Sequence, residues 1–219
     1  MPQPIEPLSI VIVGIMYFGD VVSAVSGALT AARHRMDVFG IVLIGILTGV
    51  GGGTLRDVIL GHPTWWVKNP DELVICAVAA FAAYFFQRFH LEQKSTVIWA
   101  DALGLSAFAV VGSHVAMKLE APIVVAAFLG MVTAAGGGVI RDVLTQTRPL
   151  ILSGQIYATA ALVGATAYAV LARYAVTEEV AGIVAFAMAF AVRGMAILFD
   201  IRFGVSGEPI ILMRRRQSP

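Results

Sequence analysis

An internal duplication is the feature of this sequence that most constrains its fold. The stretch Gly51-Gly52-Gly53-Thr54-Leu55-Arg56-Asp57 returns in the second half of the chain as Gly136-Gly137-Gly138-Val139-Ile140-Arg141-Asp142. The separation between Gly51 and Gly136, called the repeat offset below, also pairs Gly27 with Gly112, Gly45 with Gly130 and Thr48 with Thr133. We therefore expect the two halves of the chain to fold on one plan.

The composition indicates an integral membrane protein. Of the 219 residues, 58% are hydrophobic and 13% are charged, and the mean hydropathy is +0.85; average chains carry about 25% charged residues. Apolar runs close to the roughly 20 residues that span a bilayer as helix recur from end to end. We expect one all-α transmembrane domain over residues 1–219, whose first run is retained rather than cleaved as a signal peptide.

Charges, prolines and glycines divide the chain into seven expected transmembrane helices. Their approximate ranges are 8–32, 38–60, 71–89, 95–118, 121–145, 153–173 and 179–200. The first repeat then covers about 8–89 and the second about 95–173, with an extra helix at about 179–200. Because each repeat holds three helices, the second enters the membrane from the opposite side, and such 3+3 inverted repeats are typical of transport folds.

The basic residues outside these ranges predict an N-terminus outside and a C-terminus inside the cell. This orientation puts nine Lys and Arg residues inside and three outside, in agreement with the positive-inside rule. The inner set is Arg33, Arg35, Arg88, Lys94, Arg148, Arg202, Arg214, Arg215 and Arg216, and the outer set is Lys68, Lys118 and Arg173. The run 214–216 is expected to anchor the topology and to touch anionic membrane lipids.

Several classes of function are disfavoured by what the sequence holds. A net charge of +1 argues against nucleic acid as a partner. The lone Cys76 and four scattered histidines offer no metal-ligand spacing. We therefore expect no metal site, no cofactor and no enzymatic chemistry.

The glycine triplets are weak points within apolar helices. Inside a bilayer every backbone group needs a partner, so a triplet there predicts a bend that borders water, where carbonyl groups can be freed to contact a cation. The alternative is close helix packing through small residues. Because the triplet occurs twice and is followed each time by Arg-Asp, we favour the bend on a substrate path.

The charged residues beside the triplets need partners, because isolated charges in a membrane cost several kcal/mol. Adjacent residues on a helix point about 100° apart, so we expect Arg56 to need more than Asp57, and Arg141 more than Asp142. Asp20 is the expected partner of Arg56, and Asp101 that of Arg141. Arg193 is expected to bind Asp200 or backbone carbonyl groups.

These motifs resemble the prokaryotic branch of the trimeric intracellular cation channels over nearly the whole chain. Supporting matches are Ser26-Gly27-Ala28, Asp37-x-x-Gly40, Asp101-Ala102-x-Gly104-Leu105 and Phe108-Ala109-x-x-Gly112. The resemblance implies a homotrimer with a pore in each protomer, lined by the second and fifth helices and permeable chiefly to potassium, with some sodium. The implied pore and hinge residues are Gly51, Gly52, Gly53, Gly136, Gly137, Gly138, Thr48 and Thr133, flanked by Arg56, Asp57, Arg141, Asp142, Asp20 and Asp101.

Three functions remain open from the sequence. The first is a potassium-permeable channel in a prokaryotic inner membrane. The second is a secondary transporter of a small zwitterion such as glycine, whose carboxylate would meet Arg56 or Arg141. The third is a membrane scaffold in which the glycines serve packing alone.

Overall fold

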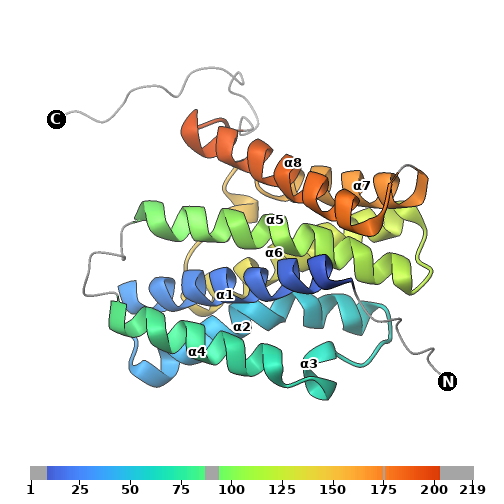
Figure 1. Cartoon of the computed structure of the whole chain (residues 1–219). Coiled ribbons are helices and arrows are strands. Elements are labelled where there is room, and N and C mark those ends of the chain that lie inside the picture. Colours follow the sequence, from blue (N-terminus) through green and yellow to red (C-terminus); the bar gives the residue numbers. More distant parts are fainter. Residues whose placement is uncertain (1–8, 87–93, 175, 203–219) are drawn as a thin grey trace.

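The described part of the chain forms a bundle of helices lying side by side (Figure 1). The computed structural model describes residues 9–86, 94–174 and 176–202. Its elements are α1 (Ile10–Arg33), α2 (Val38–Ile59), the one-turn α3 (Trp65–Lys68), α4 (Asp71–Phe86), α5 (Lys94–Lys118), α6 (Ile123–Leu144), the 3₁₀ helix η2 (Leu150–Leu152), α7 (Ala158–Tyr174) and α8 (Glu178–Leu198). The all-α expectation is confirmed. The arginine run 214–216 lies outside the described residues.

Each of the seven expected ranges holds a long helix, with one clear error at a boundary. The sixth was expected to begin near residue 153, but α7 begins at Ala158. The preceding segment forms η2 and then turns at Gly154, whose φ of +74° lies in the left-handed region that favours glycine. The short α3 was not expected, because a single turn leaves no periodic pattern in the sequence.

Five of the described helices are long and apolar enough to cross a membrane. They are α1, α2, α5, α6 and α8. The described part of α4 has 16 residues, and α7 has 17. Large apolar side chains such as Val58, Val78 and Val124 are more than 60% exposed on the bundle surface, as expected where lipid rather than water surrounds the helices.

The bundle consists of two similar groups of three helices and one addition. In the first group α1, α2 and α4 pack against one another, and in the second group α5, α6 and α7 do the same. The groups meet where α1 packs on α5 and α2 packs on α6. The last helix, α8, covers α7 and α5 (Figure 1). The duplication seen in the sequence is therefore also present in the packing.

The glycine triplets lie where α2 crosses α6. A Cβ atom on Gly52 would overlap the carbonyl oxygen of Thr133, and one on Gly137 would overlap that of Thr48. The two backbones are thus in direct contact, as small residues permit in membrane helix packing. Both helices continue as α-helix through their triplets. Close packing therefore accounts for Gly52 and Gly137, and the expected bend stays a prediction.

We predict that Gly52→Ala destabilises the protein by about 1–3 kcal/mol, because the added methyl group meets a backbone carbonyl that cannot rotate away. Gly53→Ala is the matched control, since its Cβ would meet only Nη2 of Arg56, at 3.7 Å. Thermal unfolding of the purified protein measures both. Equal unfolding temperatures for the two variants would contradict the packing described here.

Candidate functional site

The first Arg-Asp pair is buried and closed on itself. Nε and Nη2 of Arg56 both lie 2.8 Å from Oδ1 of Asp57. The other carboxylate oxygen of Asp57 accepts a hydrogen bond from the backbone N–H of Trp65, at 3.2 Å. The expectation that Arg56 needs a partner besides Asp57 is wrong within the described residues, because the long arginine side chain curls back along the helix and brings two of its nitrogens to Asp57. The hydrogen bond from Trp65 also holds the turn after α2.

The second pair repeats this arrangement. Nε of Arg141 lies 2.8 Å from Oδ1 of Asp142, whose Oδ2 accepts the N–H of Leu150 at 3.0 Å. Trp65 and Leu150 are themselves separated by the repeat offset, so the duplication extends to these backbone contacts. The segments that follow α2 and α6 are therefore held by equivalent hydrogen bonds.

Arg141 has further partners on α1 and α5. Its Nη1 lies 2.6 Å from Oδ1 of Asp101 and donates to Oγ of Ser26 at 2.8 Å. The hydroxyl of Tyr157 donates to the same Asp101 oxygen at 3.4 Å. The expected pairing of Asp101 with Arg141 is confirmed, and this network fills the space beside the second triplet.

Three substitutions explain why the first repeat lacks this network. At the repeat offset, the counterparts of Asp101, Ser26 and Tyr157 are Met16, Val111 and Glu72. The first repeat therefore has a thioether and a valine side chain at the positions where the second repeat has the carboxylate and the hydroxyl that bind Arg141. Met16 and Val111 both line a cavity beside Arg56.

That cavity lies between α1, α2, α4, α5 and α6. It encloses about 40 Å³, which is room for a few water molecules. Its polar lining consists of Asp20, Arg56, Asp57, Glu72 and Thr133, together with the two tryptophans of α3. The rest of the lining is apolar, including Phe108 and Val115, and supplies most of the cavity surface. The small volume admits water or a small ion and leaves no room for a bulky ligand.

Asp20 does not pair with Arg56, contrary to expectation. Its residue is 2% exposed, and within the described residues its Oδ2 has no hydrogen-bond partner. The described residues give Arg56 one ion-pair partner, Asp57. The physical reason is that the Arg56 guanidinium is turned along its own helix, so the α1 carboxylate is left facing the cavity.

The two triplets differ in what covers their third glycine. Gly53 lines the cavity, and a Cβ there has space. A Cβ on Gly138 would lie 2.5 Å from the hydroxyl of Tyr157. The first triplet therefore borders open space and the second is sealed by the Asp101 network.

The threonines before the triplets each donate a hydrogen bond to a carbonyl group of their own helix. The hydroxyl of Thr48 donates to the carbonyl of Ile44 at 2.6 Å, and that of Thr133 donates to the carbonyl of Leu129 at 2.7 Å. Both residues are buried. Thr133 also lines the cavity, so of the two it is the one placed beside the candidate site.

Arg193 binds a backbone carbonyl group, which is one of its two expected kinds of partner. Its Nη1 donates to the carbonyl of Ile156 at 2.9 Å and its Nη2 to Oε1 of Gln155 at 3.0 Å. Asp200 pairs with Arg202 instead. Within the described ranges, His, Cys, Asp and Glu form no group of three that could hold a metal ion.

Sequence reasoning overlooked Glu72, Met16, Ser26 and Tyr157 as parts of the site. At the repeat offset these residues stand against residues of a different type, unlike the identical glycines and threonines. The mismatched positions mark where one copy of the site departs from the other.

Comparison with known proteins gives a consistent result. A family model described as "Glycine transporter" matches residues 13–88 and 98–173. The UPF0126 inner membrane protein YadS of Escherichia coli is 37% identical over 193 residues, which are 84% of this chain and 90% of that protein. The UPF0126 membrane protein YvgT of Bacillus subtilis is 33% identical over 158 residues, covering 70% of this chain and 74% of the relative.

Solved structures include similar chains. The trimeric intracellular cation channel orthologue from Rhodobacter sphaeroides superposes with a TM-score of 0.82 at 40% identity. The match covers 87% of this chain and 98% of that one. The likeness in fold thus extends over almost the whole of the solved chain.

We predict that Asp101→Asn destabilises the protein by about 3–5 kcal/mol, the typical effect of breaking a buried ion pair, although Arg141 keeps its contact with Asp142. Asp200→Asn is the control, because its pair with Arg202 is at least half exposed and surface pairs contribute about 0–1 kcal/mol. Thermal unfolding in detergent measures the difference. An Asp101→Asn protein as stable as Asp200→Asn would show that Arg141 does not depend on this carboxylate.

Proposed function

The chain belongs to the prokaryotic branch of the trimeric intracellular cation channel family and is an integral membrane protein, and we propose that it conducts cations through each protomer of a homotrimer. Sequence identity of 40% over almost the whole of a solved member supports this. The single observation that carries the proposal is the cavity beside Gly53, which places buried charged groups next to the crossing of α2 and α6. No chemical step is required.

We further propose seven spanning helices arranged as a 3+3 inverted repeat with α8 added. The two segments matched by the family model, 13–88 and 98–173, are themselves related by the repeat offset. Equivalent contacts recur in both halves: a Cβ on Gly45 would lie 2.5 Å from that of Ala80, and one on Gly130 would lie 2.6 Å from that of Ala165. On this view α4 and α7 are the short third helices of the two repeats.

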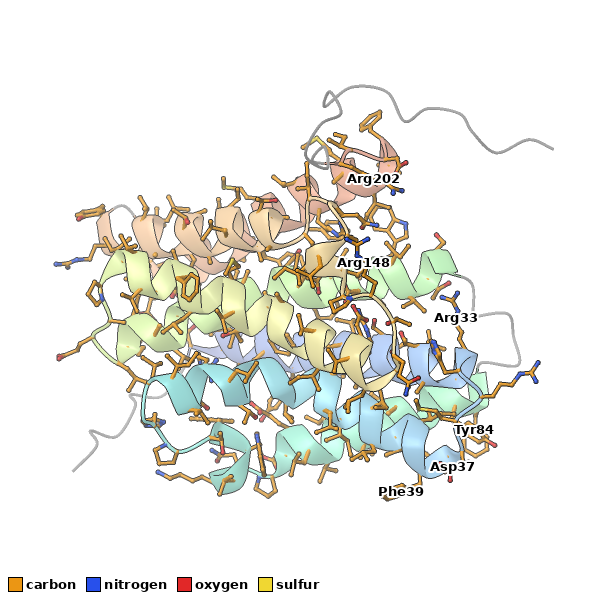
Figure 2. The ribbon with its side chains drawn as sticks, turned by 180° about the vertical axis from the view of Figure 1, so that it is seen from behind. Arg33, Asp37, Phe39, Tyr84, Arg148 and Arg202 are labelled. Atoms are coloured by element: carbon orange, nitrogen blue, oxygen red, sulfur yellow. The ribbon has the colours of Figure 1, made fainter. Side chains whose placement is uncertain are left out.

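The proposed orientation has the N-terminus outside. Arg33, Arg148 and Arg202, which were all assigned to the inner side, gather at one end of the bundle (Figure 2). Clustering of basic side chains at one end supports the positive-inside assignment. The cavity beside Arg56 then lies in the outer half of the membrane, and the sealed network of Arg141 lies in the inner half.

The permeating ions are proposed to be potassium and, to a lesser extent, sodium. Acidic side chains line the cavity, which favours cations over anions. The described residues lack a group of three His, Cys, Asp or Glu residues suited to a metal ion, whereas calcium prefers six to eight oxygen ligands. A path with few fixed ligands suits weakly bound monovalent ions.

A transporter of a small zwitterion is the second candidate, because the family model is described as a glycine transporter. Its structural support is that the cavity carries both signs of charge, with Arg56 for a carboxylate and Asp20 or Glu72 for an ammonium group. The two candidates use the same cavity but differ in what moves and how fast.

Recording in planar bilayers separates the candidates. A channel produces unitary currents whose reversal potential follows the potassium and sodium gradients. We expect such currents from the purified protein, and no current when N-methyl-D-glucamine replaces the alkali cations. Saturable uptake of radiolabelled glycine into proteoliposomes without unitary currents would instead establish the transporter, and the absence of both would leave a scaffold.

A further inference from the structure

We propose that Asp20 and Glu72 form a binding site for one monovalent cation in the cavity of the first repeat. The inference rests on the proposed cation conduction and names where along the path a cation binds. It concerns the first repeat alone, because the second repeat has neither acid at the equivalent positions: the counterpart of Asp20 is Leu105 and that of Glu72 is Tyr157.

The charges of the cavity are unbalanced. Its lining holds three carboxylates, Asp20, Asp57 and Glu72, against the single guanidinium of Arg56. Asp57 and Arg56 neutralise each other in a contact of 2.8 Å. When ionised, the remaining two carboxylates therefore leave two negative charges in a buried space, where a charge without a counter-charge is costly. A cation between them supplies the counter-charge.

The two acids are buried and face the same space. Asp20 is 2% exposed and Glu72 is 8% exposed, and both line the cavity. Oδ2 of Asp20 has no hydrogen-bond partner within the described residues. Buried carboxylate oxygens are normally paired, so a carboxylate that lines the cavity and leaves an oxygen unpaired is a candidate cation ligand.

The second repeat shows what the same place looks like when protein groups fill it. There Tyr157 donates to Oδ1 of Asp101, and the same oxygen contacts Arg141 at 2.6 Å. Oδ2 of Asp101 also lacks a hydrogen-bond partner among the described residues, but the charge of that carboxylate is already balanced by Arg141. In the first repeat Glu72 stands at the position of Tyr157. A carboxylate that accepts hydrogen bonds therefore replaces a hydroxyl that donates one, and it can bind a cation.

The size and the ligands of the cavity indicate the class of cation. Its volume of about 40 Å³ accepts an ion with one or two waters and excludes larger organic cations. Two carboxylates and water are oxygen ligands, which suit alkali ions. Calcium draws most of its six to eight oxygen ligands from several carboxylate and carbonyl groups of the protein, whereas this cavity offers two carboxylates outside an ion pair.

Equilibrium stabilisation tests the site without measuring current. The thermal unfolding temperature of the full-length protein is followed while KCl replaces N-methyl-D-glucamine chloride at constant ionic strength. Wild type is expected to gain stability saturably, because a ligand that binds only the folded state stabilises it. In Glu72→Gln and in Asp20→Asn the potassium concentration for half of the gain should rise by about tenfold or more, the expected loss of one charged ligand.

Asp71→Asn is the matched control, since Asp71 is the neighbour of Glu72 on the same helix turn but is exposed. It should keep the wild-type response. Asp20→Asn alters a fully buried position. If the Asp20→Asn protein does not fold, Glu72→Gln alone decides the outcome.

The site is refuted if wild type gains no more stability from potassium than from N-methyl-D-glucamine, or if Glu72→Gln responds as wild type does. Either result can coexist with unitary cation currents, which would leave the channel function standing without this site. Conversely, a potassium response that Glu72→Gln lacks supports the site even where recordings show no currents, and only the channel function would then be lost.

Discussion

The contact between the backbones of α2 and α6 is the constraint on which the rest of the structure depends. It requires the absence of a side chain at Gly52 and Gly137, because each faces a carbonyl oxygen of the other helix. Close approach of this kind is how helices associate in lipid, where burial of apolar surface gives little drive. The contact also fixes the residues that follow it on each helix, which are Gly53 and Arg56 on α2 and Gly138 and Arg141 on α6.

The two repeats share the same Arg-Asp arrangement but differ in the side chains around it. Both fold an arginine onto the following aspartate and tie that aspartate to a backbone N–H eight residues on. Their surroundings differ, among other positions, where the second site has Asp101, Ser26 and Tyr157 and the first has Met16, Val111 and Glu72. The space beside Arg141 in the second repeat is consequently filled by hydrogen-bonded side chains, whereas Arg56 in the first repeat borders a cavity whose lining includes Asp20 and Glu72. A nearly symmetric fold thus holds an asymmetric pair of sites.

Much of this was predictable from the sequence, and the failures have physical causes. Apolar length and punctuation located the long helices of the described residues, and the need to pair a buried charge identified Asp101 as the partner of Arg141. The expected second partner of Arg56 was wrong because it rested on the direction of the Cβ atoms, whereas the long arginine side chain reaches the next residue. Glu72 was missed because its helix-start position resembles a solvated turn, and only packing shows that it is buried.

The central claim is that the first triplet borders water and the second does not. Reaction of an engineered cysteine with silver ion, a thiol-reactive monovalent cation small enough for the cavity, measures this directly, in a Cys76→Ala background and with size-exclusion profiles confirming the fold. Gly53→Cys should be modified much faster than Gly138→Cys, because the cavity reaches Gly53 whereas Tyr157 covers Gly138. Equal rates for the two positions, or an unreactive cysteine at position 53, would contradict the account.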